Sequence, residues 1–279
     1  MLRNAFAYIT RKWPKSLLLF AIILLMGTLS LIGLSMKGAT QQASSESLGS
    51  ITNSFSMQIN RRTNPGTPRG AGNLRGEDIE KISQVEGITS SIRRINAIAD
   101  ILDHEIIETE ETLQNQSPER AKYFKNTLMV TGVNDSSKED KFVSGAYKLV
   151  QGKHLTDKDK NQILMHEDLA KKNGLKVGDK VRLKSNLYDA DNEKGANETV
   201  EVTIKGLFSG KNQAPLTYAQ ELYEDTLISD LDTAAKLYGN TVQTATYEDA
   251  TFFAKGDQDL DKLIEKIKAL DIPWNYFDL

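Results

Sequence analysis

The pattern of apolar and polar positions along the chain begins with one long apolar run. Residues 16–36 contain no charged side chain. A helix of this length, at about 1.5 Å per residue, covers roughly 31 Å, the thickness of a bilayer core. The run is longer than the apolar part of a secretory signal, and no Ala-x-Ala cleavage pattern follows it. The sequence therefore predicts a retained transmembrane helix over 16–36, with a cleaved signal as the weaker alternative.

The next residues, 37–53, are small and polar, and composition does not decide between a flexible linker and a helical stalk. Alternation of Phe55, Met57 and Ile59 with polar residues then predicts a strand. An apolar residue at every third position predicts a helix over 77–85, and isoleucines at intervals predict a strand over 89–102.

The end of the chain repeats this strand–helix–strand pattern. Residues 250–254 read as a short apolar strand, and an apolar stripe on a charged segment predicts a helix over 260–270. Pro273 ends that helix, and Trp274–Leu279 read as the closing strand. Two such units predict an α+β, ferredoxin-like domain of the porter type, built from residues 54–135 and 225–279.

The middle of the chain has a different pattern of short strands and turns. We expect strands over 127–133, 180–185 and 200–204, and a brief helix over 163–173. A polar hairpin loop is expected over 186–197. Residues 136–224 are therefore predicted to form a small β-rich domain inserted into the first.

The distribution of charge predicts the orientation of the apolar run in the membrane. Arg3, Arg11, Lys12 and Lys15 precede it, and no acidic residue occurs in 1–36. By the positive-inside rule, residues 1–15 form a cytoplasmic basic amphipathic segment, and residues 37–279 lie outside the cell membrane. These later residues carry 31 of the 35 basic and all 38 acidic side chains. An acidic ectodomain of this kind is not expected to bind nucleic acid.

No motif of the chain predicts an active site. Gly206–Asn212 has the wrong spacing for a phosphate-binding loop and places Asn212 where Ser or Thr would bind magnesium. Gly70–Gly76 lacks the third glycine of a dinucleotide fingerprint by one position. Asn197–Thr199 is a glycosylation sequon by pattern only.

A metal or cofactor site is likewise not predicted. Asp189–Glu193 resembles the start of a calcium loop, but Lys194 stands at the glycine position and Val200 at that of the bidentate glutamate. The absence of cysteine excludes thiol catalysis and thiolate zinc sites. Two further features are expected to be surface or structural: the scattered histidines and the acidic run. They comprise His104, His154 and His166, then Glu105, Glu108, Glu110 and Glu111.

Four stretches carry a resemblance to a known family: Gly152–Asp159, Gln162–Met165, Leu169–Val181 and Thr203–Phe208. Their glycines permit tight turns, and their apolar positions suit a small β core. The pattern resembles the extracytoplasmic core domain of MacB/FtsX-type ABC transporter permeases. Among Gram-positive members it most resembles the Vex-type permeases of streptococci, which implies a Gram-positive source.

The resemblance implies a non-catalytic permease subunit of the mechanotransmission type. Such a subunit sits in the lipid bilayer and dimerises with a second permease subunit, identical or similar. A separate ATP-binding subunit powers it, and its cargo is often a peptide, toxin or antibiotic. The sequence leaves open a different class, a single-pass membrane-anchored extracellular sensor or binding protein.

The chain departs from the family's pattern at one point. Family members continue after the ectodomain with three further membrane helices and a coupling loop, whereas this sequence ends at Leu279. We therefore expect a fragment, a truncated reading frame or a trimmed piece of a longer protein.

Overall fold

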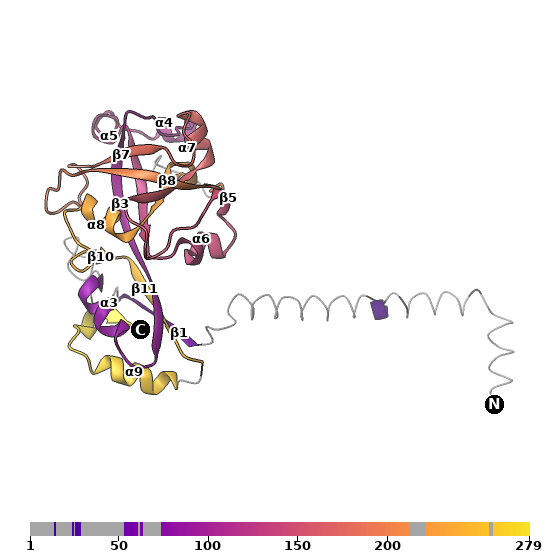
Figure 1. The fold of residues 1–279 in the computed structure, drawn as a ribbon, viewed down its shortest axis with the longest axis vertical. Helices are drawn as coiled ribbons and strands as arrows, with labels where there is room; N and C mark the ends of the chain where they lie inside the picture. Colours follow the sequence, from indigo (N-terminus) through magenta and orange to yellow (C-terminus); the bar gives the residue numbers. More distant parts are fainter. Residues whose placement is uncertain are drawn as a thin grey trace. The chain divides into compact units, whose positions relative to one another are not determined.

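One long strand, β3 (Ile88–Leu102), belongs to two different groups of strands (Figure 1). The structure, a computed structural model, describes Pro14, Leu24 and residues 26–28, 53–60, 62–63, 74–212, 221–256 and 259–279. Residues Asn53–Leu279 form one unit and Met1–Thr52 another.

The predicted membrane helix 16–36 lies outside the described residues except at Leu24 and residues 26–28, which are helical. The predicted segment 1–15 is described at Pro14 alone, and the stalk 37–53 at Asn53 alone. Among the residues that are described, none of the helices is long and apolar enough to cross a membrane.

The first group of strands, here named the sheet lobe, uses β3 up to Arg94. Its order is β12 (Phe277–Asp278), β1 (Asn53–Ile59), β11 (Asp249–Ala254) and β3, with every neighbouring pair antiparallel. Helix α3 (Gly76–Ser83) lies between β1 and β3 in sequence, and helix α9 (Leu260–Lys268) lies between β11 and β12. A two-stranded ribbon of β2 (Leu74–Arg75) and β10 (Thr246–Tyr247) adjoins them.

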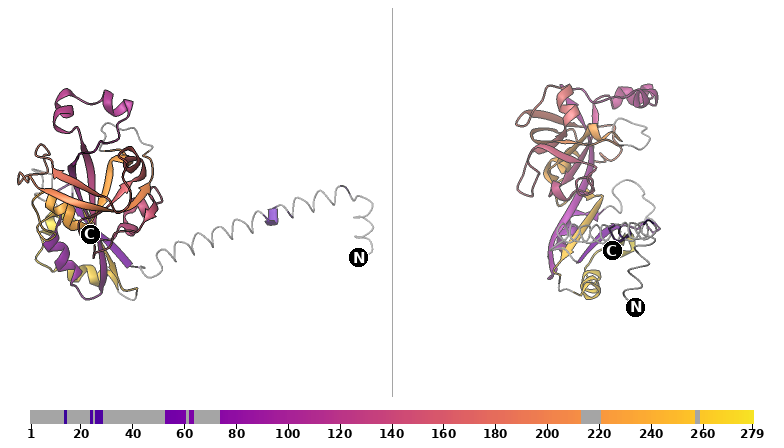
Figure 2. Two further views of the ribbon diagram at one scale, coloured as in Figure 1. Left: turned by 45° about the horizontal axis from the view of Figure 1, so that its top comes forward. Right: turned by 90° about the vertical axis from the view of Figure 1, so that its right-hand side faces the viewer.

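The sheet lobe buries one face of its sheet under its two helices. Phe55 stacks on Phe252 with ring centroids 5.3 Å apart, and alternation along each strand leaves the neighbouring residues more exposed. Ile82 of α3 and Ile267 of α9 are fully buried in the same core. The apolar stripes that predict these helices therefore face the core. Figure 2 shows both helices beside the strands of this lobe.

The second group, here named the barrel lobe, closes on itself. Each strand pairs with the next, and the last returns to the first, in the order β3, β4 (Thr127–Val133), β9 (Thr226–Ser229), β6 (Gln162–His166), β8 (Thr199–Ser209), β7 (Lys180–Ser185) and β3 again. Strand β5 (Lys148–Gly152) adds to β8 outside this ring. A closed ring leaves no open edge, which removes the usual site of unwanted strand pairing.

Short helices surround the barrel. They are α4 (Glu110–Gln114), α5 (Pro118–Tyr123), α6 (Asp140–Val143), α7 (Glu167–Lys172) and α8 (Leu231–Leu237), with 3-10 turns at Ser136–Lys138 and Tyr223–Asp225. Helix α8 packs on β3 and β4 at Gly132, where an added Cβ would come within 2.5 Å of the Ala234 Cβ. Gly152 has φ +84° and pairs with Gly206, so two glycines of the family pattern serve the β5–β8 contact.

Several sequence predictions are confirmed, including the mixed α+β class and the strands over 127–133 and 180–185. Others need correction. Residues 163–166, expected to start a helix, belong to strand β6, because Leu164 and Met165 are buried on opposite faces and Ile163–Met165 are all apolar. Trp274–Tyr276 form a 3-10 turn, so the closing strand is confined to β12.

The strands are also shared differently from the expected domain division. Strands β4 and β9, assigned from sequence to the segments 54–135 and 225–279, pair with each other in the barrel ring. Helix α8, expected in the second of those segments, packs on the barrel strands β3 and β4. The barrel lobe thus recruits strands from both sides of the segment 136–224.

Candidate functional site: the cleft between the lobes

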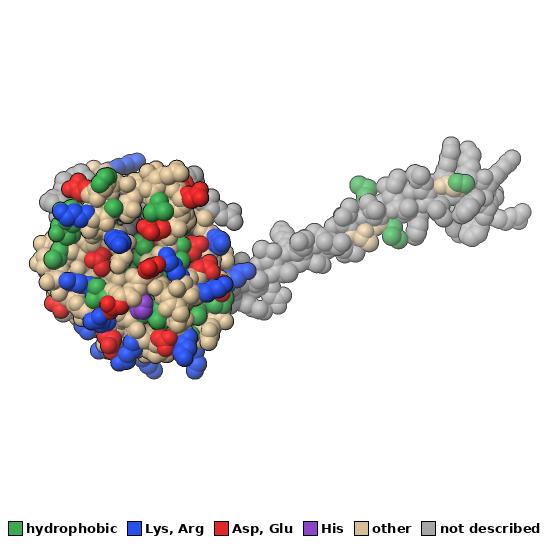
Figure 3. Space-filling model, turned by 90° about the horizontal axis from the view of Figure 1, so that it is seen from above, with side chains coloured by type: hydrophobic (Ala, Val, Ile, Leu, Met, Phe, Trp, Pro, Cys, Tyr) green, Lys and Arg blue, Asp and Glu red, His purple; other side chains and the backbone are tan. Residues whose placement is uncertain are grey.

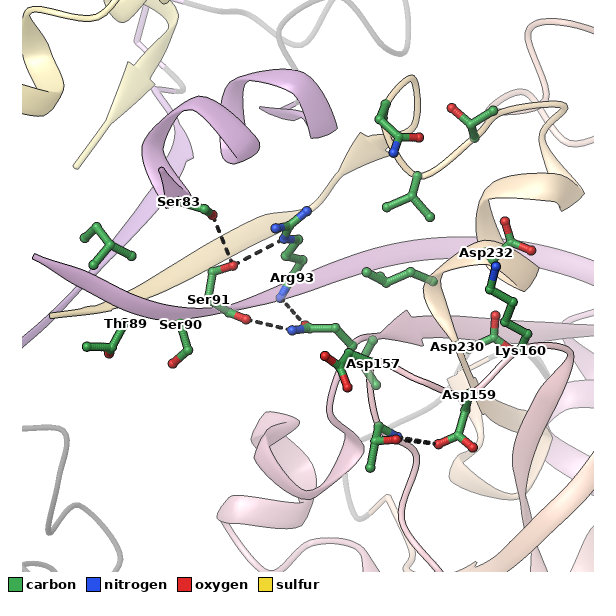
Figure 4. Close-up of a pocket in the computed structure, with 18 residues that line it drawn as sticks. Ser83, Thr89, Ser90, Ser91, Arg93, Asp157, Asp159, Lys160, Asp230 and Asp232 are labelled. Carbon is green, nitrogen blue, oxygen red and sulfur yellow. Dashed lines mark hydrogen bonds between the residues drawn. The ribbon is translucent and has the colours of Figure 1, made fainter. Parts of the chain in front are cut away.

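A cleft of about 760 Å³ lies where the sheet lobe meets the barrel lobe (Figure 4). One wall is the start of β3 with the end of α3, and the other is the loop 156–160 with the start of α8. The end of β4 and the loop 241–243 complete the lining. The volume is in the range of binding sites for small ligands or short peptides.

The β3 wall is rich in hydroxyl groups and carries one arginine. The Arg93 guanidinium forms an ion pair with Glu80 at 3.1 Å, and its Nε donates to the Ser91 Oγ at 3.2 Å. The Ser83 Oγ lies 3.4 Å from the same Ser91 hydroxyl. These contacts tie β3 to α3 and hold the Arg93 side chain, which is 17% exposed, in a fixed position.

The opposite wall is acidic, and most of its carboxylates already have partners. Both oxygens of Asp159 accept from Lys205 Nζ at 2.6 Å. Burial opposes ionisation of Asp159, but the bonds from Lys205 and Thr156 outweigh it and lower its pKa. Asp230 accepts from the Thr233 and Gln162 backbone N–H groups, at 3.0 and 2.9 Å. These aspartates therefore stabilise the wall rather than wait for a ligand.

Two charged side chains of the cleft have no such partners among the described residues. Asp157 and Lys160 are exposed, and neither makes an ion pair or hydrogen bond to any described residue. Figure 4 shows both on the acidic side of the cleft, with Thr89 and Ser90 on the strand opposite. Because they have no partner among the residues that the structure describes, these two side chains can contact a ligand.

An arginine beside the cleft connects the two lobes. Arg94 is the residue at which β3 passes from its pairing with β11 to its pairing with β4. Its guanidinium contacts Asp249 of the sheet lobe and, at 3.0 Å, Asp140 of α6 in the barrel lobe. Burial raises the pKa of Asp249 despite this neighbour, so the pair is partly desolvated.

A further buried carboxylate lies in the barrel lobe, away from the cleft. Asp225 is fully buried, and its Oδ1 accepts from the Ile107 N–H at 2.7 Å. Its Oδ2 has no hydrogen-bond partner among the described residues. Burial raises the pKa of Asp225 to about 8, and the charge of Glu224 adds to this effect.

The three histidines are placed apart from one another. His154 Nδ1 lies 2.9 Å from the Ser136 hydroxyl, and burial lowers its pKa. His166 is buried, and its Nε2–H donates to the Gly210 carbonyl at 2.8 Å. His104 lies in the turn after β3. Among the described residues no group of three or more His, Cys, Asp or Glu side chains could hold a metal ion.

The other sequence candidates also have structural positions. Gly206 and the three residues after it continue strand β8, so they form no phosphate loop. Asp189, in the calcium-like segment, is buried and accepts from the Tyr238 hydroxyl. The run from Glu105 to Glu111 forms a loop and the first turn of α4, and residues 70–73 lie outside the described residues.

The cleft itself has no counterpart among the sequence candidates. Its walls come from segments as distant as Ser83 and Gln243. Each segment reads as an ordinary strand end, loop or cap, and no spacing within one segment indicates the others.

Comparison with known proteins places the chain in a family. The family described as "MacB-like periplasmic core domain" matches residues 16–270. An uncharacterized ABC transporter permease of Bacillus subtilis, YclI, is 22% identical over the whole of this chain. The chain spans 61% of that relative's length.

Two solved structures show weaker likeness. The periplasmic region of MacB from Actinobacillus actinomycetemcomitans has a TM-score of 0.49 at 17% identity, covering 82% of this chain and 89% of that one. The extracellular domain of the ABC-type transporter YknZ from Gram-positive bacteria has a TM-score of 0.41 at 12% identity, covering 76% and 88%. The family match covers most of the sequence and confirms the predicted resemblance, and the chain therefore belongs to the family of MacB-like periplasmic core domains.

Proposed function

We propose that this chain is the N-terminal part of a permease subunit of an ABC transporter. The observation that carries the proposal is the family match over residues 16–270, which begins at the first residue of the apolar run. The B. subtilis relative, described as an ABC transporter permease, supports the same assignment.

In this proposal residues 16–36 cross the cell membrane once, with the N-terminus in the cytoplasm and residues 37–279 outside. Arg3, Arg11, Lys12 and Lys15 contact anionic headgroups, at about 1 kcal/mol for each residue near the surface. The sheet lobe is ferredoxin-like: the order β12-β1-β11-β3, with one helix after β1 and one after β11, supports this assignment.

The chain works by mechanotransmission and is not itself an enzyme. A separate ATP-binding subunit hydrolyses ATP, and a second permease subunit completes the transporter. Strand β1 follows the membrane segment in sequence, and β3 continues from the sheet lobe into the barrel lobe. A displacement of β1 would therefore reach the barrel through β11, β3 and the Arg94 contacts. The moved cargo is a peptide, toxin or antibiotic.

Co-purification tests the transporter assignment. The full-length gene product, extracted in mild detergent from its own membranes, is expected to bring down an ATP-binding subunit at a fixed stoichiometry. Recovery of the product alone, with unchanged function after deletion of neighbouring ATPase genes, would favour the single-pass sensor or binding protein instead.

A second experiment tests the anchor independently. Replacing Leu24 and Leu25 with Arg puts two charges near the middle of the apolar run, at about 2.5–3.5 kcal/mol each. The variant is expected to leave the membrane fraction, while substitution of the same residues with Ile leaves it there. Unchanged fractionation of the arginine variant would refute the anchor.

A further inference from the structure

We propose that Asp225 is a pH-sensitive latch on the arm that α4 and α5 form at one end of the barrel lobe. In its protonated form Asp225 holds the segment 103–109, here named the arm root, against the barrel, and its ionisation releases this segment. The inference concerns the described fold and holds whether or not the chain works with an ATPase.

The arm is a long excursion between two strands that lie side by side. Strands β3 and β4 pair directly, yet residues 103–126 separate them, where a tight hairpin needs about two to five residues. Helix α5 buries none of its side chains, and Thr112 is the buried residue of α4. Figure 1 shows both helices at the end of the barrel lobe, next to α7. The arm therefore adds little to the core, and its position depends on how its ends are held.

The carboxyl group of Asp225 holds the arm root through one oxygen only. Its Oδ1 accepts from the Ile107 N–H at 2.7 Å, and its Oδ2 has no hydrogen-bond partner among the described residues. The side chain is fully buried. A neutral carboxyl group fits such a place at modest cost, whereas a carboxylate there is a buried charge without an ion pair to a described residue. Ionisation of Asp225 therefore favours any state in which water reaches it.

Helix α7 holds the same arm root by bonds that do not involve Asp225. Lys172 Nζ donates to the Ile106 C=O at 2.7 Å. The Asn173 side-chain amide accepts from the Glu105 N–H at 2.9 Å and donates to the Glu105 C=O at 2.8 Å. These bonds set the basal strength of the attachment, and Asp225 adds the part that changes with its charge.

The arm root is the part of the cover over Asp225 that can move most easily. The turn Tyr223–Asp225 also packs against α7 and β6. Both are regular elements with backbone hydrogen bonds of their own, whereas residues 103–109 form neither helix nor strand. Opening at the root breaks the fewest backbone bonds, so it is the expected response to a charge on Asp225.

The charged groups around Asp225 act in both directions. Burial raises the pKa of Asp225 to about 8, Glu224 beside it and Glu108 of the arm root raise it further, and Lys172 of α7 lowers it. The same elements carry other titratable side chains: Tyr223 on the turn, His166 at the end of β6, and Glu105 of the arm root, which pairs with Lys172 at 3.5 Å.

The direction of the response follows from these two states of Asp225. Its pKa is about 8 when covered and takes the ordinary value of 3.8 when the root opens to water. Opening therefore becomes easier by up to about tenfold per pH unit between these values and levels off above about pH 8. Figure 3, seen from the end that carries the arm, shows acidic and basic side chains interspersed, so no field of one sign from that face replaces these local effects.

Hydrogen exchange of the full chain in detergent tests the latch at pH 5.5, 6.5 and 7.5. After correction for the intrinsic pH dependence of exchange, the protection of residues 103–109 is expected to fall by about five- to tenfold per pH unit. It should stay below that of β8 at each pH, because the root opens while the barrel remains folded. Protection that is independent of pH, or equal to that of β8, would overturn the proposal.

Substitution of the carboxyl group assigns the effect. Asp225→Asn keeps an oxygen that accepts from the Ile107 N–H and cannot ionise, so the root should stay as protected at pH 7.5 as at pH 5.5, within about threefold. Glu167→Gln removes an exposed carboxylate from α7 and should keep the response of the unchanged chain. The same pH response in Asp225→Asn would assign it to another group and overturn the proposal.

Spin labels follow the arm itself and need no change at Asp225. The chain has no cysteine, so a label pair can be placed with Leu113→Cys in α4 and Val150→Cys in β5, at side chains that are 50% and 49% exposed. The distance distribution is expected to be narrow at pH 5.5 and to gain a broad second population at pH 8.5. The same narrow distribution at both pH values would overturn the release of the arm.

Discussion

The sheet lobe and the barrel lobe bury the apolar faces of their strands in different ways. The sheet lobe covers one face with two amphipathic helices and leaves the other face less buried. The barrel lobe closes its strands into a ring, fills the inside with apolar side chains and covers part of the outside with a second cluster around Tyr147 and Phe208. Strands β1 and β11 of the sheet lobe therefore alternate in burial, as do β7 and β8 of the barrel lobe, whereas β6 is buried on both faces.

The two lobes also differ in how they treat buried charge. In the sheet lobe the half-buried Asp249 faces Arg94. In the barrel lobe the fully buried Asp225 has one carboxylate oxygen without a partner. Paired charges resist changes of pH, whereas an unpaired buried carboxylate responds to them. The lobes are nevertheless linked, because β3 contributes to both cores.

The largest expected effect tests whether that link makes unfolding cooperative. Phe252→Ala removes a fully buried ring from the sheet lobe and is expected to lower the free energy of unfolding by about 3–5 kcal/mol. Because β3 is shared, circular dichroism in guanidinium should still show one transition. Phe253→Ala, on the opposite face of the same strand, is the control and should cost less than half as much. Loss of the sheet lobe alone, with barrel amides still protected from exchange, would separate the lobes.

The ion pairs of Arg94 offer a sharper test of the link between the two lobes. Arg94→Ala leaves Asp249 partly buried without its partner, and is expected to cost about 2–3 kcal/mol and to speed amide exchange in β11. Arg182→Ala breaks an exposed pair with Asp103 at the end of β3 and should cost under about 1 kcal/mol. Equal losses in the two variants, measured by urea unfolding, would mean that Arg94 has no special role between the lobes.

The pH response distinguishes the lobes by their buried acids. The folded pKa of Asp225 is about 8, above its ordinary value of 3.8, so the folded state binds more protons in between. Stability from this group is therefore complete below about pH 4 and is lost as the pH rises toward 8, by at most about 1.4 kcal/mol per unit. Asp225→Asn should remove this slope in urea unfolding between pH 5.5 and 8.

The charged groups near Asp225 are Glu224 beside it, Glu108 in the loop between β3 and α4, and Lys172 of α7. Replacing either glutamate with Gln, or Lys172 with Met, should change the urea midpoint but keep the dependence of stability on pH. The same slope in the Asp225→Asn variant would assign the pH dependence to another group.

The smallest effect concerns the periphery of the barrel. The Ser117 hydroxyl caps α5 by accepting from the Arg120 N–H at 3.1 Å. Ser117→Ala is expected to cost about 0.5–1 kcal/mol locally. Faster exchange within α5, with the global midpoint unchanged, is the expected result, and Ser117→Thr should restore protection. A shift of the global midpoint would show that α5 supports the barrel core.

Local patterns predicted those elements whose two faces differ. Helix α9 was recognisable because Leu263 and Ile267 fall on one stripe, and β1 because apolar and polar residues alternate. The sequence predicts a helix from residue 163, where the structure has strand β6, because both faces of this strand are buried and a short apolar run has no period that distinguishes a strand from a helix.

The cleft could not be predicted in the same way. Its walls are brought together by pairings between residues far apart in sequence, such as Arg94 with Val133 and Ile163 with Ser229. In the sequence, Asn134 and Asp157 look like ordinary loop residues. Only the fold places them in the cleft, with Asn134 bonded to the backbone of β3.

The sequence by itself determined the family, the mixed α+β class and the position of most of the described strands and of helices α3 and α9. These depend on side-chain polarity within a few neighbouring residues, which local spacing records. Only the tertiary structure decided that six strands close into a ring and that β3 serves two lobes. Those features depend on hydrogen bonds between distant backbone groups, which are the same for every residue type and so leave no pattern in the sequence.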